Sequence, residues 1–149
     1  MTGVPHTDRP NLSTLSPRAR FLAHCAKGEL AFQRDPATGR AIFYPRMAAP
    51  GSGAEHPPWE VSAGIGTVYS TTCVRSRDGD HNVALIDMEE GFRLLSRVES
   101  TAPDAVRIGQ QVRVRMRTDD GEDPYPVFDP LTDGSVTDCP ETDLRDGAR

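Results

Sequence analysis

Cysteine is scarce in this chain of 149 residues, and its three copies, Cys25, Cys73 and Cys139, are far apart. No two form a C-x-x-C pair, and an odd number does not suit a disulfide framework. We therefore interpret Cys25 and Cys73 as small buried hydrophobic residues and Cys139 as a free thiol in a tail. No histidine is paired with any of them in the sequence, so a catalytic thiol has no support.

Long apolar runs are also missing. No stretch approaches the ~18 apolar residues of a membrane span, and residues 1–20 lack the apolar core of a secretory signal. These absences lead us to expect a cytoplasmic protein without a membrane partner. The chain also lacks a G-x-S-x-G, an H-E-x-x-H and a phosphate loop, so we expect no catalysis by the chain alone.

Hydrophobic residues make up only 36% of the chain, which has 13 glycines and 13 prolines, so part of it should be loop or tail. Charge is unevenly placed. Residues 119–149 contain ten acidic and two basic side chains, a net charge of −8. Residues 1–118 have a net charge of +3. The negative net charge of the whole chain therefore comes from its acidic end, and the rest is mildly basic.

Local signals in the first half predict one helix and one hairpin. Ser16 and Pro17 are typical of a helix N-cap and first position, and the helix should span 17–27. The segments 29–33 and 41–44 then flank a tight turn, which indicates a β-hairpin. A proline- and glycine-rich loop follows up to residue 58.

The second half is β-rich. Residues 59–74 read as one long strand bent at Gly64 and Gly66, because glycines inside a strand mark a bulge or bend. Two strands joined by a turn at 89–91 follow, then the alternating segment 110–118 and a proline-flanked edge strand at 125–131. Five β segments with regular turns predict a small closed barrel of the OB type.

The predicted fold is mainly β. After an N-terminal helix, two tight turns at 35–39 and 49–53 flank a short apolar run as in a zinc ribbon, but neither turn contains a cysteine. We interpret this part as a degenerate rubredoxin-like ribbon that precedes a five-stranded OB-fold barrel. The expected divisions of the chain are a flexible arm at 1–15, the helix and metal-free ribbon at 16–58, the OB-fold at 59–131 and an acidic tail at 132–149.

Two motifs, "SAGIGTVYS" at 62–70 and "ALIDMEEGFRLL" at 84–95, lie in an ordered pattern that runs from about residue 21 to 130. This pattern resembles a bacterial and archaeal family of acyl-CoA-associated proteins in which a zinc ribbon precedes an OB-fold. The family was long catalogued as a domain of unknown function. In it the ribbon usually reads C-x-x-C in the first turn and C-P-x-C-G in the second.

The resemblance places the four zinc ligands at Asp35, Thr38, Ala49 and Ser52, so all four thiolates are lost. A structural zinc site needs four nitrogen or sulfur ligands, which one aspartate and two hydroxyls cannot supply. His24 and His56 are nearby but lack ligand spacing. We therefore predict no zinc and no other cofactor bound by this chain.

The resemblance also implies the function. Family members are accessory subunits of thiolase-like enzymes, so we expect a non-catalytic subunit of a thiolase, an acyltransferase or a side-chain-cleaving aldolase. It would stabilise its catalytic partner and shape the CoA and acyl channel, in a two-plus-two hetero-oligomer that binds acyl-CoA.

Two sets of side chains are candidates for contacts. Arg113, Arg115 and Arg117 lie on one side of the alternating strand, either to bind phosphates of CoA or nucleic acid or as a solvated, charge-paired face. Phe43, Tyr44 and Trp59 either contact a partner or pack locally, and Phe128 packs on the barrel or on a partner.

Two other functions remain open. An OB-fold with a basic strand can bind single-stranded nucleic acid, but stacking aromatics on the barrel are few and the acidic end opposes phosphates. A stand-alone enzyme acting on a CoA thioester could use Cys73, although an apolar strand raises a thiol pKa and favours inertness.

Overall fold

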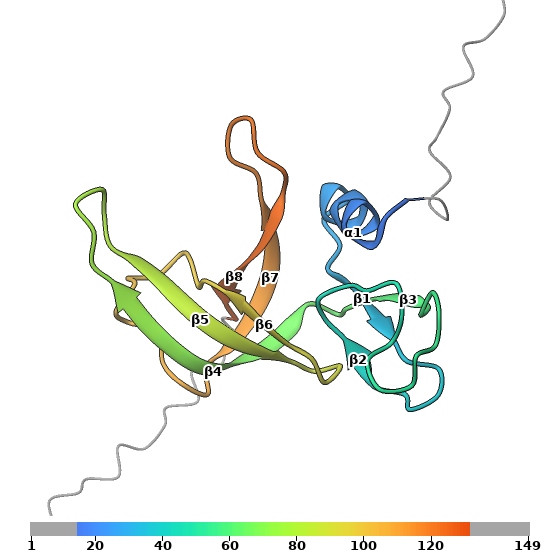
Figure 1. Ribbon diagram of the computed structural model, residues 1–149. Coiled ribbons are helices and arrows are strands. Elements are labelled where there is room, and N and C mark those ends of the chain that lie inside the picture. The colour runs from blue at the N-terminus through green and yellow to red at the C-terminus, as the bar shows by residue number, and fades with distance from the viewer. Residues whose placement is uncertain (1–14, 132–149) are drawn as a thin grey trace, which may run out of the picture.

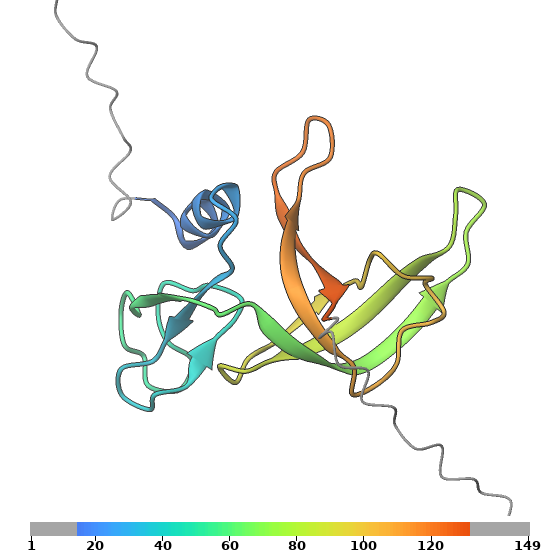
Figure 2. The ribbon, with the colours of Figure 1, turned by 180° about the vertical axis from the view of Figure 1, so that it is seen from behind.

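The computed structural model describes residues 15–131 as one helix, a three-stranded sheet and a five-stranded barrel. Helix α1 (Pro17–Ala26) and the small sheet lie together on one side of the barrel, and the hairpin of the last two strands rises beside α1 (Figures 1 and 2). The predicted arm at 1–15 and tail at 132–149 lie almost wholly outside the described residues. Within 15–131, no helix has the length and apolarity needed to cross a membrane.

Helix α1 begins where the sequence predicts. The Ser16 hydroxyl accepts a hydrogen bond from the backbone N–H of Ala19 at 3.2 Å, and Pro17 occupies the first turn. The helix ends at Ala26, and Gly28 follows with a φ of +80°, a conformation that glycine adopts without a steric cost. Phe21 on this helix meets Phe43 of the ribbon edge-to-face, with ring centroids 5.6 Å apart.

The small sheet lies where the ribbon is predicted, and residues 31–61 are called the ribbon from here on. Strands β1 (Ala31–Arg34) and β2 (Ala41–Ile42) form the expected antiparallel hairpin. Strand β3 (Trp59–Val61) pairs with the other side of β1, giving the order β2-β1-β3. The predicted hairpin is confirmed, and the return strand is an addition to it.

The prediction of a single bent strand over 59–74 is wrong. Its first part, β3, belongs to the ribbon sheet, and its second part, β4 (Ile65–Val74), belongs to the barrel. Gly64 has a φ of +82° at the crossing between them. The Glu90 carboxylate accepts hydrogen bonds from the Ser62 hydroxyl at 2.9 Å and from the Ala63 N–H at 2.7 Å. Gly64 therefore marks the point where the chain passes from one sheet to the other. In the sequence, such a crossing looks the same as a bend within one strand.

The barrel has the OB strand order. Its hydrogen-bonded order is β6-β5-β4-β7-β8, with every pair antiparallel. The remaining strands are β5 (His81–Met88), β6 (Arg93–Ser96), β7 (Gln111–Arg117) and β8 (Tyr125–Pro130). The outer edge of β8 is also paired, because the Phe128 N–H donates to the Arg97 carbonyl at 3.0 Å and its carbonyl accepts from Glu99. This contact closes the barrel, so the predicted edge strand is covered.

One hydrophobic core runs through ribbon and barrel. Phe92, just after the β5–β6 turn, lies 4.9 Å from Phe32 of β1 and 5.1 Å from Phe43, measured between ring centroids. Leu30 and Phe32 belong to the same buried cluster as the barrel residues Val68, Ile86, Val112 and Phe128. The ribbon and the barrel are therefore held together by shared aromatic packing.

Candidate functional site

An apolar hollow lies between α1, the ribbon and the barrel. The residues that line one hollow of about 340 Å³ include Phe21, Phe43, Tyr44, Leu94, Leu95 and Tyr125. A second hollow of about 380 Å³ shares three of these residues, Phe21, Tyr44 and Tyr125, and extends along α1. Because the two share walls, we treat them as one surface, called here the apolar groove.

Two large apolar side chains at the apolar groove face solvent. Tyr44 is 60% exposed and Leu95 is 58% exposed. Phe43 is partly buried beneath Tyr44, where it contacts Phe21 and Phe92. Exposed aromatic and aliphatic residues around a hollow are typical of the centre of a protein interface.

The other two aromatic candidates lie elsewhere. Trp59 stacks on His24 with centroids 5.7 Å apart and lies under the guanidinium of Arg20, so it is held by α1 and lies outside the apolar groove. Phe128 is fully buried in the barrel core. The interface role considered for Phe128 is therefore wrong, because strand β8 directs its side chain inward and the bridge to Val98 covers it.

Leu95 was not among the sequence-predicted site residues. The signal for it is the pair Leu94-Leu95 in a strand, where neighbouring side chains must point to opposite faces. Leu94 is 2% exposed and fills the core, which leaves Leu95 outside.

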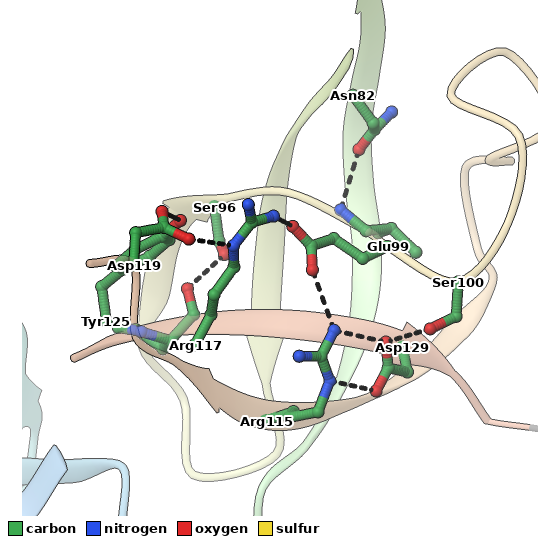
Figure 3. A network of polar contacts seen from close by, with 11 residues as sticks. Asn82, Ser96, Glu99, Ser100, Arg115, Arg117, Asp119, Tyr125 and Asp129 are labelled. Atoms are coloured by element: carbon green, nitrogen blue, oxygen red, sulfur yellow. Dashed lines mark hydrogen bonds and ion pairs between the residues drawn. The ribbon is translucent and has the colours of Figure 1, made fainter. Parts of the chain in front are cut away.

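The arginine strand is largely neutralised by carboxylates of the same chain (Figure 3). Arg115 binds Asp129 and Glu99, each at 2.8 Å. Arg117 binds Asp119 at 2.9 Å and also pairs with Glu99. Glu99 thus bridges the two guanidinium groups across the closing edge of the barrel.

These pairs shift the ionisation of both partners. The hydrogen bond from Arg115 lowers the pKa of Asp129, with a further contribution from the Ser100 hydroxyl. Tyr125 and then Arg117 lower the pKa of Asp119. The same contacts raise the pKa of Arg115 and Arg117. The network therefore favours fully charged groups that already satisfy one another.

We expect acid to weaken this network. A carboxyl with a lowered native pKa stabilises the fold above its unfolded pKa of about 4, and that contribution disappears as pH falls through the native pKa. Wild type should lose stability between about pH 5 and pH 2. Asp129→Asn should be less stable than wild type at pH 7 and should lose less on acidification. Thermal unfolding followed from pH 7 to pH 3 measures this, and parallel curves for the two proteins would contradict it.

Arg113 differs from its two neighbours on the strand. Among residues 15–131 it forms no ion pair, and its side chain is exposed. It lines a shallow polar hollow with Arg115, Asp129 and Gly28. Of the three arginines, Arg113 is the one whose guanidinium is most available to an added phosphate, and this role stays a prediction.

The barrel face offers little for base stacking. Tyr69 on β4 is 51% exposed, but the Arg93 guanidinium lies 3.5 Å from its ring centroid and also pairs with Asp87. The ring face that a base would need is thus covered by a cation. Together with the neutralised arginines, this contact weakens the nucleic-acid alternative.

The two described cysteines lie in different surroundings. Burial raises the pKa of Cys25 to about 11, so its thiol stays protonated. Cys73 is half-buried on β4 rather than fully buried as expected, opposite Asn82 on β5. Cys139 lies outside the described residues.

The four positions that the resemblance equates with zinc ligands do not suit a metal. Asp35, Thr38 and Ser52 meet through hydrogen bonds, and Ala49 contributes only a methyl group. Within 15–131, no three histidine, cysteine, aspartate or glutamate side chains gather closely enough to hold an ion. One carboxylate and two hydroxyls do not fit the nitrogen and sulfur set of structural zinc.

A known family and solved structures resemble this chain in sequence and fold. Residues 59–117 match the family model described as the C-terminal OB-fold domain of ChsH2. A solved structure named Ltp2-ChsH2(DUF35) aldolase matches with a TM-score of 0.68 and 28% sequence identity. The match covers 77% of this chain and 94% of that one, so it includes the ribbon as well as the barrel. These matches show that the chain resembles the DUF35 family in its OB-fold domain and in its fold.

A second DUF35 structure, a protein of unknown function from Sulfolobus solfataricus, matches with a TM-score of 0.55 and 14% identity. The match covers 68% of this chain and 79% of that one, and at this identity it shows a common fold only. A search of curated protein sequences found no significant match. The family-model match and the Ltp2-ChsH2(DUF35) structure thus confirm the resemblance that the order of motifs indicated.

Proposed function

We propose that this protein is a non-catalytic accessory subunit, of the DUF35 type, of a thiolase-like enzyme that acts on acyl-CoA. The observation that supports this most is the match to nearly the whole of one chain of the Ltp2-ChsH2(DUF35) aldolase.

The partner would bind at the apolar groove. Tyr44 and Leu95 expose large apolar surface there, and covering such surface is the main favourable contribution to protein association. Because α1, the ribbon and the barrel all line the groove, a partner in it would contact all three parts of the fold. In this way the subunit would stabilise its partner and shape the end of the CoA and acyl channel.

The assembly would be a two-plus-two hetero-oligomer in the cytoplasm, with acyl-CoA bound in the complex and neither cofactor nor zinc bound by this chain. A tagged form of this protein recovered from its native host, with mass spectrometry of the proteins that accompany it, tests the proposal. A stoichiometric thiolase-like protein is the expected result. Recovery of single-strand-binding machinery, or of the chain alone, would overturn it.

Arg113 is our candidate for contact with a CoA phosphate in the complex. We expect Arg113→Ala to raise the KM for acyl-CoA about fivefold with little change in kcat, because an exposed charge-assisted hydrogen bond contributes about 1 kcal/mol. Arg77→Ala, on the exposed β4–β5 turn, is the matched control. Steady-state kinetics of the purified complex measure both. Equal KM values for Arg113→Ala and wild type would remove Arg113 from the site.

A further inference from the structure

Two turns of the ribbon have the same backbone hydrogen bonds. In the first, the Gly39 N–H donates to the Asp35 carbonyl at 2.7 Å and the Asp35 N–H donates to Arg40 at 2.8 Å. In the second, the Gly53 N–H donates to the Ala49 carbonyl at 3.0 Å and the Ala49 N–H donates to Ala54 at 2.8 Å. The glycines have nearly equal φ values, +71° and +72°. The turns are therefore equivalent position by position, 35 to 49 and 38 to 52.

The side chain of Asp35 joins these two turns. It is only 2% exposed, and it accepts hydrogen bonds from the Ala37 N–H at 2.9 Å and from the Thr38 hydroxyl at 3.0 Å, both within its own turn. Its other bond crosses the ribbon to the Ser52 hydroxyl, also at 3.0 Å. At the fourth equivalent position Ala49 is 3% exposed, so a methyl group fills the remaining space.

A buried carboxylate without partners is costly, and it is tolerated only when donors surround it. Here three donors converge on Asp35. Two of them, the hydroxyls of Thr38 and Ser52, occupy equivalent positions in the two turns. The Asp35 carboxylate is thus a single point to which both turns bind. In a zinc ribbon, the metal ion is the point to which both turns bind.

We propose that the Asp35 carboxylate is the cross-link of this ribbon and takes the place of a metal ion. The segment 41–47 runs between the two turns and contains Phe43 and Tyr44, so the cross-link also fixes one wall of the apolar groove. The ribbon then needs no zinc to hold this wall, and the side-chain link between its two turns depends on one hydroxyl group, that of Ser52.

The two hydroxyls provide a matched comparison. Each donates to Asp35 at 3.0 Å, and each accepts from a backbone N–H two residues later at 3.3 Å, from Arg40 for Thr38 and from Ala54 for Ser52. Only the Ser52 bond crosses between the turns. The variants Ser52→Ala and Thr38→Ala therefore differ mainly in whether the cross-link survives.

We expect Ser52→Ala to lower the Tm of the full chain by roughly 4 °C, against about 2 °C for Thr38→Ala. Hydrogen exchange should quicken in both turns of Ser52→Ala but only in residues 35–40 of Thr38→Ala. Wild type should purify without stoichiometric zinc, and neither EDTA nor added ZnCl₂ should move its Tm. Equal effects of the two variants, or a stabilising zinc ion in wild type, would overturn the proposal.

A quadruple variant tests whether both turns converge on one point. With Asp35→Cys, Thr38→Cys, Ala49→Cys and Ser52→Cys together, we expect one Co²⁺ per chain with the visible absorption bands of a tetrahedral thiolate site. Wild type should show no such bands. If the quadruple variant binds no Co²⁺, or binds it with octahedral spectra, the turns do not share a centre and Asp35 is not in the place of a metal.

Discussion

Phe92→Ala is expected to remove about 3–5 kcal/mol from the free energy of unfolding, which is a large share of the 5–15 kcal/mol typical of a domain. Phe92 is 5% exposed and contacts Phe32 and Phe43, the two aromatic residues by which the ribbon packs on the barrel. Its removal leaves a cavity at the junction that neither sheet can close alone, because each is fixed by its own strand pairing. The ribbon should therefore loosen before the barrel does.

Urea unfolding followed by near-ultraviolet circular dichroism measures this loss. The environment of the aromatic rings in the ribbon should change at lower urea than the far-ultraviolet signal of the barrel strands. Leu95→Ala, in the neighbouring strand β6 but 58% exposed, is the control and should change stability by less than about 0.5 kcal/mol. A similar loss in both variants would show that Phe92 is not the junction.

Combining Tyr44→Glu with Leu95→Glu is expected to weaken binding of the proposed catalytic partner at least 100-fold. The two side chains are the most exposed apolar groups at the apolar groove, and a carboxylate placed there would be desolvated without a partner on association. Because both positions face solvent in the free chain, the fold should be unaffected. Calorimetric titration of the purified partner into each protein measures the change.

Ile108→Glu is the matched control for this experiment. Ile108 is 71% exposed, more than either groove residue, but it lies in the loop before β7 and lines neither hollow of the apolar groove. The control should bind like wild type. Loss of binding in Ile108→Glu with normal binding in the groove variant would move the interface to another face of the barrel.

The resemblance to the family could be predicted from the sequence, because the order of motifs is present although the cysteines expected in the two turns are not. The partner role remains a proposal that rests on the match to one chain of an aldolase. The apolar groove could not be predicted in the same way. Its walls come from α1, the ribbon and three barrel strands, which meet only after the chain has folded.

What the sequence by itself determined is local. Ser16 and Pro17 place the start of α1, because a cap and a fixed φ act within one turn. The turn at 35–39 sets the β1–β2 hairpin, and the alternation in 111–117 sets which side chains of β7 face outward. Each of these signals depends on neighbours no more than a few residues away.

Only the tertiary structure decided how distant segments share their hydrogen bonds and their core. Residues 59–61 joined the ribbon instead of the barrel because β1 offered a free edge. Phe128 became core because the chain at 97–99 closed over β8. Arg115 and Arg117 pair with Glu99, and Arg115 also pairs with Asp129. Asp35 accepts a hydrogen bond from Ser52, 17 residues away. No local sequence pattern encodes these contacts. Such pairings depend on which strands become neighbours, and that is settled by the packing of the whole chain.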